Sequence, residues 1–488
     1  MKSASLEHVR GLLDQAGSIY RDDPEASSQI EALRKRADEP LRVALVGTVK
    51  AGKSTLVNAL LGEQLAPTDA RECTRIVTWY RHGNAPSVRA LHTVQGELQI
   101  PTLRQDGRLE LDLGHLDANE IEWLDVMWPA APLEEFTLID TPGMASVSAE
   151  VGERTVEFVA PEGGVTVADA FVYLLRSLHA HDVEFLRTLG DRTGGETSMG
   201  SIAVLSRADE LGAGRLNAMA VANKAVDRLR DDPTLEAVCE TVVPVAGLLA
   251  LAGQSLRQSE FVHLQKLAAL PPDRLSALMV STDRFMSAES DDLPSPRDRT
   301  NLVHRLGLFG IRLALAVIQV GVSDASTLAD ELVRHSGLDE LKRVIDVHCR
   351  RRHPQLKAHS VLLGLQQVFA DSPVPESAEL AAAVDELLAD PHPFQEMKLL
   401  GRVSSSRINL RSEDRIEMER LLGGSGTTPR ERLGVDTDQR HHALTALWKW
   451  RDYAANPFFD PDTAEACRVT ARTCEWIVAE LSVSSPVG

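Results

Sequence analysis

The sequence contains few cysteines, few aromatic residues and less positive than negative charge. Five of its 488 residues are cysteine and no two stand at Cys-x-x-Cys spacing, which argues against a disulfide framework or a zinc site. Lys and Arg number 52 against 71 Asp and Glu, so the formal net charge is −19. Nucleic-acid binding needs an excess of positive potential, and we therefore expect no nucleic-acid partner.

Long hydrophobic runs are absent as well. No stretch reaches the roughly 18 uninterrupted apolar residues of a membrane-spanning helix. The nearest, 306–322, is broken by Arg312, Gln319 and three glycines. The N-terminal residues MKSASLEHVRGLLDQ lack the apolar core of a signal peptide. We expect a soluble protein that is at most peripheral to a membrane, in which 306–322 forms a buried helix or an apolar wedge.

The hydrophobic pattern that is present predicts an α/β domain with a mostly parallel sheet. Short apolar runs indicate strands covered on both faces, and helical patterns separate them. These runs are 43–46, 136–139, 171–175, 202–205 and 242–245. We place the α/β domain at 40–350, with a helical elaboration at about 249–334. Residues 1–39 and 351–488 have helical spacing.

A phosphate-binding loop follows the first predicted strand. Residues 47–54 read GTVKAGKS, a complete G-x4-G-K-S pattern, and a helix is predicted at 55–61. Backbone N–H groups of such a loop surround a phosphate, Lys53 reaches the terminal phosphates, and Ser54 offers a hydroxyl to Mg²⁺. We predict nucleotide contacts from Gly47, Val49, Lys50, Ala51, Gly52, Lys53, Ser54 and Thr55.

A second motif, Asp-Thr-Pro-Gly at 140–143, follows the strand predicted at 136–139. An acid at a strand tip can hold a Mg²⁺ water, and a glycine N–H can donate to a γ-phosphate. We assign these roles to Asp140 and Gly143. The bare pattern also occurs in ordinary turns, so its position after a buried strand carries the assignment.

A third motif, Ser206-Arg207-Ala208-Asp209, follows the strand predicted at 202–205. GTP-binding proteins place [Asn/Thr]-Lys-x-Asp here, and the carboxylate accepts two hydrogen bonds from guanine. Asp209 holds that position, Ser206 offers a hydroxyl contact, and Arg207 can lie flat over a base. Val245 and Ala246 occupy the position of the final base-contacting loop.

The segment between the first two motifs should supply a threonine that senses the γ-phosphate through Mg²⁺. Thr74, which precedes the apolar pair Ile76 and Val77, is the preferred residue, and Thr68 is the second choice. Ser54, Thr74 and Asp140 thus form the predicted Mg²⁺ site.

These segments together resemble the bacterial dynamin-like GTPases. The run LRVALVGTVKAGKSTLVNALLGEQLAPTDARECTRIVTWYRHG is similar in particular to the isoniazid-inducible dynamin-like proteins of mycobacteria. Further matches are SRADELGAGR, VPVAGLLAL, FGIRLALAV and LLGGSGT, so the similarity spans most of the chain.

The resemblance implies a GTPase that hydrolyses GTP to GDP and phosphate and acts on a membrane. It implies an α/β P-loop GTPase domain, and an all-α helical bundle built from 1–39 and 351–488. It further implies peripheral association with the inner face of the cell membrane. Self-association through the GTPase heads, or pairing with a related dynamin-like partner, belongs to the same expectation.

Three details separate the chain from small signalling GTPases or from other dynamins. The distance of 87 residues from Lys53 to Asp140 leaves room for an inserted segment at roughly 85–130. Met144 stands where signalling GTPases carry a water-orienting Gln, so we expect catalysis to draw on head-to-head dimerisation. Lys50 replaces the usual dynamin serine, and its ammonium either supplies charge at the β–γ bridge or is solvated at the loop rim. Lys50, Lys53, Thr74 and Gly143 are the predicted catalytic residues.

Two other functions stay open at this stage. The chain could be a regulatory GTP-binding switch that recruits a protein partner and has no membrane task. It could also be a phosphate-loop protein that uses ATP. A basic stretch, formed by 350–352 with Lys342, Arg343 and Lys357, is either a charged helix junction or a contact for anionic lipid.

Overall fold

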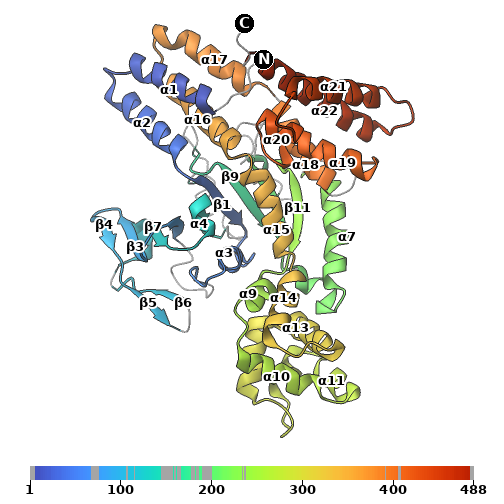
Figure 1. Ribbon diagram of the computed structural model, residues 1–488. Coiled ribbons are helices and arrows are strands. Elements are labelled where there is room, and N and C mark those ends of the chain that lie inside the picture. Colours follow the sequence, from blue (N-terminus) through green and yellow to red (C-terminus); the bar gives the residue numbers. More distant parts are fainter. Residues whose placement is uncertain are drawn as a thin grey trace.

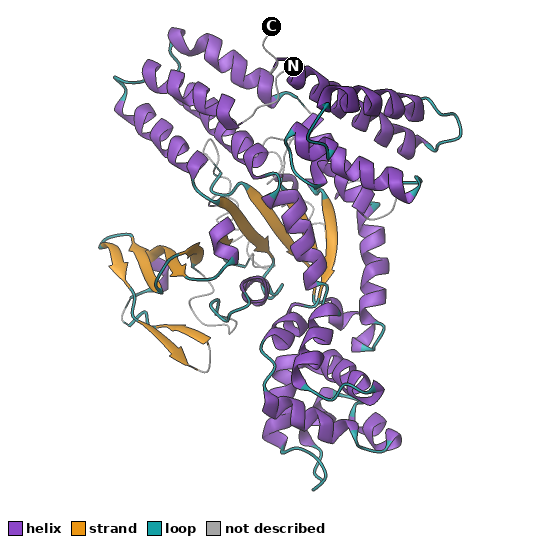
Figure 2. Cartoon of the chain, in the orientation of Figure 1, coloured by secondary structure: helices purple, strands orange, loops and turns teal. Residues whose placement is uncertain are grey.

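The computed structural model describes residues 6–67, 76–105, 108–114, 116–143, 158, 161, 166–176, 182, 186–188, 200–232, 235, 238–390, 392–404 and 408–483. A sheet lies at the centre of the molecule, and groups of helices lie beyond both ends of its strands (Figure 1). Figure 2 shows that the described strands run from the middle of the molecule to its left edge and that the regions at top and bottom are helical.

The strands are β1 (Leu41–Gly47), β2 (Val77–His82), β3 (Ser87–His92), β4 (Gly96–Gln99), β5 (Thr102–Gln105), β6 (Arg108–Leu111), β7 (Ile121–Trp128), β8 (Phe136–Asp140), β9 (Ala170–Leu175), β10 (Ser201–Ser206) and β11 (Thr241–Val245). In the described part of the chain, nine of them form one sheet in the order β11-β10-β9-β1-β8-β2-β7-β3-β4. Strands β5 and β6 form a separate antiparallel hairpin.

The five apolar runs of the sequence are β1, β8, β9, β10 and β11, and they form the parallel half of the sheet. Their burial on both faces explains the unbroken apolar pattern. In β1, Val43 and Leu45 enter one core and Ala44 and Val46 enter the other. Helices α3 (Lys53–Leu61) and α15 (Leu338–Ile345) contribute to the first core, and α7 (Ala218–Arg230) contributes to the second.

The other half of the sheet is mixed. Strand β2 runs antiparallel to β8 and parallel to β7, and β3 and β4 continue the sheet as antiparallel strands. The 3-10 helix η2 (Ala118–Glu120) precedes β7, and the short helix α4 (Pro132–Glu135) precedes β8. The segment expected at roughly 85–130 thus widens the sheet beyond β2.

Helices from both ends of the chain pack together at one end of the sheet. The N-terminal helices α1 (Leu6–Ile19) and α2 (Pro24–Asp38) share one apolar core with α16 (His353–Asp371) and α17 (Ala378–Leu388). Between them, Tyr20 donates its hydroxyl to the Ser372 carbonyl at 2.7 Å and stacks on Phe369. A short 3-10 turn, η6 (Pro375–Ser377), joins α16 to α17.

The remaining C-terminal helices have a core of their own. They are α18 (His392–Ser404), α19 (Ser412–Glu419), the π-helical turn η7 (Arg420–Gly424), α20 (Pro429–Leu433), α21 (Gln439–Ala454) and α22 (Pro461–Val483). Helix α18 approaches the sheet so closely that a Cβ on Gly401 would stand 2.5 Å from the Glu240 carbonyl oxygen. The predicted fold class, an α/β domain with a mostly parallel sheet plus helices from both ends of the chain, is therefore confirmed.

The helical elaboration forms the opposite end of the molecule (Figure 1). It consists of α9 (Gly247–Gln254), α10 (Gln258–Ala268), α11 (Pro272–Leu278), α12 (Thr282–Ser287), α13 (Pro296–Val320) and α14 (Ala325–Arg334). Helix α13 is the one described helix long and apolar enough to cross a membrane by length and composition, and 39% of its most apolar window is buried. Leu306, Phe309 and Ile311 of this helix lie in the core of the elaboration, which supports the buried-helix interpretation.

The basic stretch is a helix junction, formed by the end of α15, the π-helical turn η5 (Asp346–Arg350) and the start of α16. Arg351 donates to Asp346 at 2.7 Å. The side chains of Arg352 and Lys357 are fully buried, so they cannot reach a lipid surface in this structure.

A buried ion cluster joins the sheet to the helices of both chain ends. The side chain of Asp169, just before β9, is fully buried and accepts from Arg36 of α2 at 2.8 Å. Its second oxygen lies 2.7 Å from Lys357 Nζ of α16 and accepts the Arg42 N–H at 2.8 Å. Although burial opposes ionisation, Arg36 and Lys357 outweigh it and lower the pKa of Asp169 from 3.8 to about 2.

We expect Asp169→Asn to lower the free energy of unfolding by about 3 kcal/mol, because it leaves two buried cations without their anion. Since the pKa of Asp169 is depressed on folding, its contribution is complete above the unfolded value of 3.8 and disappears as the pH falls through about 2. Urea unfolding at neutral pH and near pH 3 measures both effects. Asp38→Asn, which removes an exposed partner of Arg10, is the control and should change stability by less than about 0.5 kcal/mol. Equal stabilities of the two variants would contradict the expectation.

Candidate nucleotide-binding site

The phosphate loop lies between β1 and α3 and depends on its glycines. Gly47 has φ 153°, and a Cβ there would stand 2.5 Å from the Leu174 carbonyl oxygen of β9. Gly52 caps α3 with φ 93°, where an L side chain would be strained. Lys50 also has a left-handed backbone, with φ 62°, and its side chain is exposed. The loop thus presents its backbone at the N-terminus of α3, as phosphate binding requires.

Lys53 is folded back into the loop. Its ammonium donates to the carbonyl oxygens of Gly47 at 3.0 Å and Thr48 at 3.4 Å, and the residue is buried. Burial lowers the pKa of Lys53, and the nearby Asp140 opposes that shift. A desolvated ammonium whose hydrogen bonds, among the described residues, go to carbonyl oxygens would gain from an incoming phosphate.

Asp140 at the tip of β8 meets Ser54 at the start of α3. The Ser54 hydroxyl donates to Asp140 Oδ2 at 2.9 Å. Burial raises the pKa of Asp140, while Lys53 and the Ser54 hydrogen bond oppose the rise. Its other oxygen, Oδ1, is buried and has no hydrogen-bond partner among the described residues. A hydroxyl and a carboxylate with an unused oxygen form the hard-oxygen donor set that suits Mg²⁺.

Gly143 brings the second motif against the phosphate loop. A Cβ on Gly143 would stand 2.9 Å from Val49 Cα and 3.2 Å from Lys53 Nζ. Thr141 secures this approach, because its hydroxyl donates to the Leu45 carbonyl of β1 at 2.8 Å. The structure therefore places Gly143, Val49 and Lys53 together, at the position expected of a γ-phosphate.

The third motif lines a cavity of about 150 Å³ beside the loop. The lining residues are Ala51, Gly52, Thr55, Leu56, Leu174, Val204, Ser206, Arg207, Asp209, Glu210, Val245, Gly247 and Leu248. The cavity lies where the carboxyl ends of parallel strands β9, β10 and β11 meet, the usual place for a ligand in such a sheet. Most nucleotide contacts predicted from sequence are thus adjacent in space.

The residues predicted to recognise the base differ in whether their side chains already bind other groups of the protein. Asp209, in the 3-10 helix η4 (Ala208–Gly214), lines the cavity, and burial raises the pKa of its carboxyl. Ser206 donates its hydroxyl to the Leu175 carbonyl at 3.1 Å. Arg207 has φ 52° and pairs with Glu210 at 2.7 Å.

The last predicted loop is only partly in the cavity. Val245 lines it, whereas Ala246 is buried in the core of the elaboration and donates its N–H to the Ser336 carbonyl at 2.8 Å. Thr68 and Thr74 lie outside the described residues.

Several lining residues were not predicted from sequence. Leu174 comes from the end of β9, and its backbone carbonyl also packs on Gly47. Glu210 adjoins the third motif and pairs with both Arg176 and Arg207. Leu248 lies two residues after Ala246, so extending the predicted loop by two residues would have included it. Leu174 carried no signal, because a leucine in a buried strand is normally a core residue.

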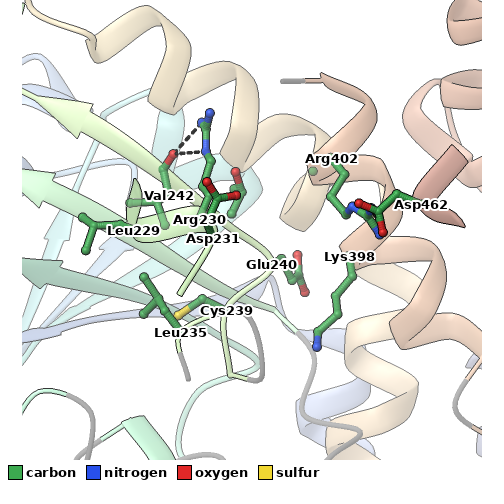
Figure 3. A pocket seen from close by; sticks show the side chains of 12 residues that line it. Leu229, Arg230, Asp231, Leu235, Cys239, Glu240, Val242, Lys398, Arg402 and Asp462 are labelled. Atoms are coloured by element: carbon green, nitrogen blue, oxygen red, sulfur yellow. Dashed lines mark hydrogen bonds and ion pairs between the residues drawn. The ribbon is translucent and has the colours of Figure 1, made fainter. Parts of the chain in front are cut away.

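A second cavity, of about 470 Å³, lies between β11 and the C-terminal helices. Figure 3 shows Lys398, Arg402 and Asp462 on one side and Arg230, Asp231 and Cys239 on the other. Arg402 pairs with Asp462 at 3.3 Å, and Glu240 binds His348 at 2.6 Å. The positive and negative charges that line this second cavity therefore balance, and most of them pair with other groups of the protein. Asp140, in contrast, has a carboxylate oxygen without a hydrogen-bond partner among the described residues.

The chain is similar to several known proteins. The model of the Dynamin family matches residues 43–199. The isoniazid-induced protein IniC of Mycobacterium tuberculosis is 42% identical over 493 residues, covering 98% of this chain and 99% of that protein. Dynamin-like protein A of Bacillus subtilis is 29% identical over 196 residues, which are 38% of this chain and 15% of that protein. A solved structure of an oligomerised bacterial dynamin pair aligns with 98% of this chain and 74% of its own, at 12% identity and a TM-score of 0.37.

The fold and the site define a phosphate-loop nucleotide-binding protein, and the chain belongs to the dynamin family of GTPases. Within that family it is similar over nearly its whole length to the isoniazid-induced protein IniC, as the sequence motifs predicted.

Proposed function

We propose that the chain hydrolyses GTP to GDP and phosphate and couples hydrolysis to remodelling or maintenance of a membrane. The observation that carries the catalytic part is the meeting of Lys53, Ser54 and Asp140. There a buried ammonium lies beside Gly143, and the Ser54 hydroxyl binds a carboxylate whose other oxygen has no hydrogen-bond partner among the described residues.

In this proposal the loop amides and Lys53 bind the phosphates, and Gly143 donates its N–H to the γ-phosphate. Ser54, Asp140 and Thr74 would hold Mg²⁺, which would supply positive charge beside the phosphates. Lys50 supplies further positive charge at the loop rim. Asp209, assisted by Ser206, Arg207 and Val245, recognises guanine, whereas Ala246, whose N–H binds the Ser336 carbonyl, is left out of the base contacts. We also keep 40–350 as the GTPase domain, with 1–39 and 351–488 as the helical parts.

The membrane part of the proposal assigns the chain to the inner face of the cell membrane as a peripheral protein. It rests on membership of the dynamin family and on one surface feature. Phe458, in the turn between α21 and α22, is 92% exposed. An aromatic ring at the tip of a helical hairpin can enter the interfacial layer of a bilayer at low cost. Self-association of the heads would supply the catalytic contacts that Met144 does not.

Hydrolysis per molecule should rise with protein concentration and rise again when anionic liposomes are added. Phosphate release measured across a concentration series, combined with liposome co-sedimentation, tests both parts. Phe458→Ser should weaken sedimentation several-fold, whereas Val94→Ser, an 83% exposed apolar residue on the β3–β4 turn, serves as the control. GTP hydrolysis without lipid binding in any nucleotide state would instead support a regulatory switch that recruits a protein partner.

A further inference from the structure

Helix α13 breaks where it meets the base-recognition loop. Gly307, in the middle of this helix, has φ 65° and ψ 173°, which are not helical values. A Cβ on Gly307 would stand 3.9 Å from Asp209 Oδ2 and 3.7 Å from Leu248 Cδ2. The break in α13 therefore borders the carboxylate and the leucine that line the base cavity.

Two close contacts hold α13 at this position. Arg312, one turn beyond the break, donates to the Gly214 carbonyl at the end of η4 at 2.6 Å, and to the Met279 carbonyl at 2.7 Å. Gly310 lets the helix approach α9, because a Cβ there would stand 3.1 Å from Leu249 Cδ1. Two of the elements that carry cavity-lining residues, η4 and α9, are thus packed directly on α13.

The break also has an electrostatic consequence for Asp209. It gives the second half of α13, from Leu308 onward, an N-terminus of its own, whose first N–H groups have no partner within that helix. A Cβ built on Gly214, the last residue of η4, would stand 3.9 Å from the Phe309 nitrogen. The positive N-terminal end of the second half of α13 therefore lies next to η4. Burial raises the pKa of Asp209, but guanine needs the ionised carboxylate as its acceptor. A helix N-terminus beside the loop favours that ionised form.

We propose that α13 is part of the nucleotide site and that its break at Gly307, together with Leu248, sets the affinity for the guanine base. The inference rests on the proposed function, since its ligand is the guanine of GTP or GDP. By reciprocity, guanine binding would stabilise the contact between η4 and α13, so the helical elaboration would respond to nucleotide occupancy. Gly307 acts through Asp209 and Leu248 and is a positioning residue.

Gly307→Ala tests the proposal, because an L side chain disfavours φ 65° and would shift α13 away from Asp209. We expect the Kd of a fluorescent GDP analogue and the KM for GTP to rise about tenfold, while kcat changes by less than twofold. Gly321→Ala is the matched control: it places a side chain at φ 124° at the C-cap of the same helix, where the added Cβ faces open space. A Kd within twofold of the wild-type value in folded Gly307→Ala protein, judged by thermal unfolding, would overturn the proposal.

Hydrogen exchange of the unaltered chain gives a second readout if Gly307→Ala does not fold. Adding GDP should slow amide exchange at 308–312 as well as in the phosphate loop, 47–55. Protection of the loop without protection of 308–312 would overturn this inference and leave the proposed function intact. Protection of neither segment would mean that the chain does not bind GDP, which contradicts the proposed function itself.

Discussion

Replacing Asp209 by Asn should invert the base preference of the protein. A carboxylate accepts hydrogen bonds from the N1–H and the exocyclic amine of guanine, which ATP cannot provide at the same positions. An Asn amide offers an N–H₂ donor instead, which repels the guanine amine but pairs with the C2 carbonyl of xanthine. Sites built to bind a particular polar group discriminate by about 10⁴-fold, so we expect a change of that order in the ratio of GDP to XDP affinity.

Titration of fluorescent GDP, XDP and ADP analogues measures this inversion. Glu210→Gln is the matched control: it makes the same change from carboxylate to amide in the same loop, at an exposed residue that pairs with Arg176 and Arg207. It should change affinity by only a few-fold, since exposed ion pairs contribute little. An Asp209→Asn protein that retains the nucleotide preference of the wild type would remove Asp209 from base recognition. Preference of the wild type for ADP would support the ATP-using alternative.

Replacing Lys53 by Ala should lower kcat/KM for GTP by about 10³-fold. The side chain of Lys53 is buried between the loop and Asp140, so water cannot replace its charge on the phosphates. Among the described residues, the ammonium donates hydrogen bonds to the carbonyl oxygens of Gly47 and Thr48. Its removal also takes a favourable charge away from Asp140, but Asp140 keeps the hydrogen bond from Ser54, and burial already raises its pKa and so favours the neutral form. We therefore expect the variant to unfold within a few degrees of the wild type, and steady-state phosphate release to report the loss.

Lys50→Ala provides the internal comparison, because the two lysines lie in the same loop and differ in exposure. Lys50 has a left-handed backbone and an exposed side chain, so it can reach a bound nucleotide only from the rim. We expect slower turnover with little change in GTP affinity, in contrast to the loss of both in Lys53→Ala. Unchanged turnover in Lys50→Ala would identify Lys50 as a solvated rim residue, and normal turnover in Lys53→Ala would contradict the proposed mechanism.

The sequence predicted those parts of the fold whose physical requirements are local. Strands β1, β8, β9, β10 and β11 are buried on both faces, so each had to be an unbroken apolar run. The phosphate loop could also be predicted from the sequence, because Gly47 and Gly52 adopt backbone conformations that other residues avoid. Strands β3 and β4 alternate in burial or are largely exposed, and no comparable run marks them.

The assignment of single side chains at the site was harder to predict from sequence. Ala246 follows the last base-contacting strand, yet its N–H donates to Ser336, which lies 90 residues further along the chain. Nothing in the sequence distinguishes the basic residues of this stretch from one another. The fold nevertheless buries the side chains of Arg352 and Lys357 and leaves Arg350 near the surface. Burial of a charge depends on which helices pack around it, and no local pattern records that.

The sequence by itself determined the dynamin family, the phosphate loop, the acid at the tip of β8 and the position of the Ser206-Arg207-Ala208-Asp209 motif after β10. Each of these features depends on a few residues that are adjacent in the sequence. Only the tertiary structure decided that Asp169 joins helices from both ends of the chain, and that Gly307 of α13 borders Asp209. These contacts join residues about a hundred or more positions apart, and they exist only because the sheet and the helical elaboration pack in one arrangement.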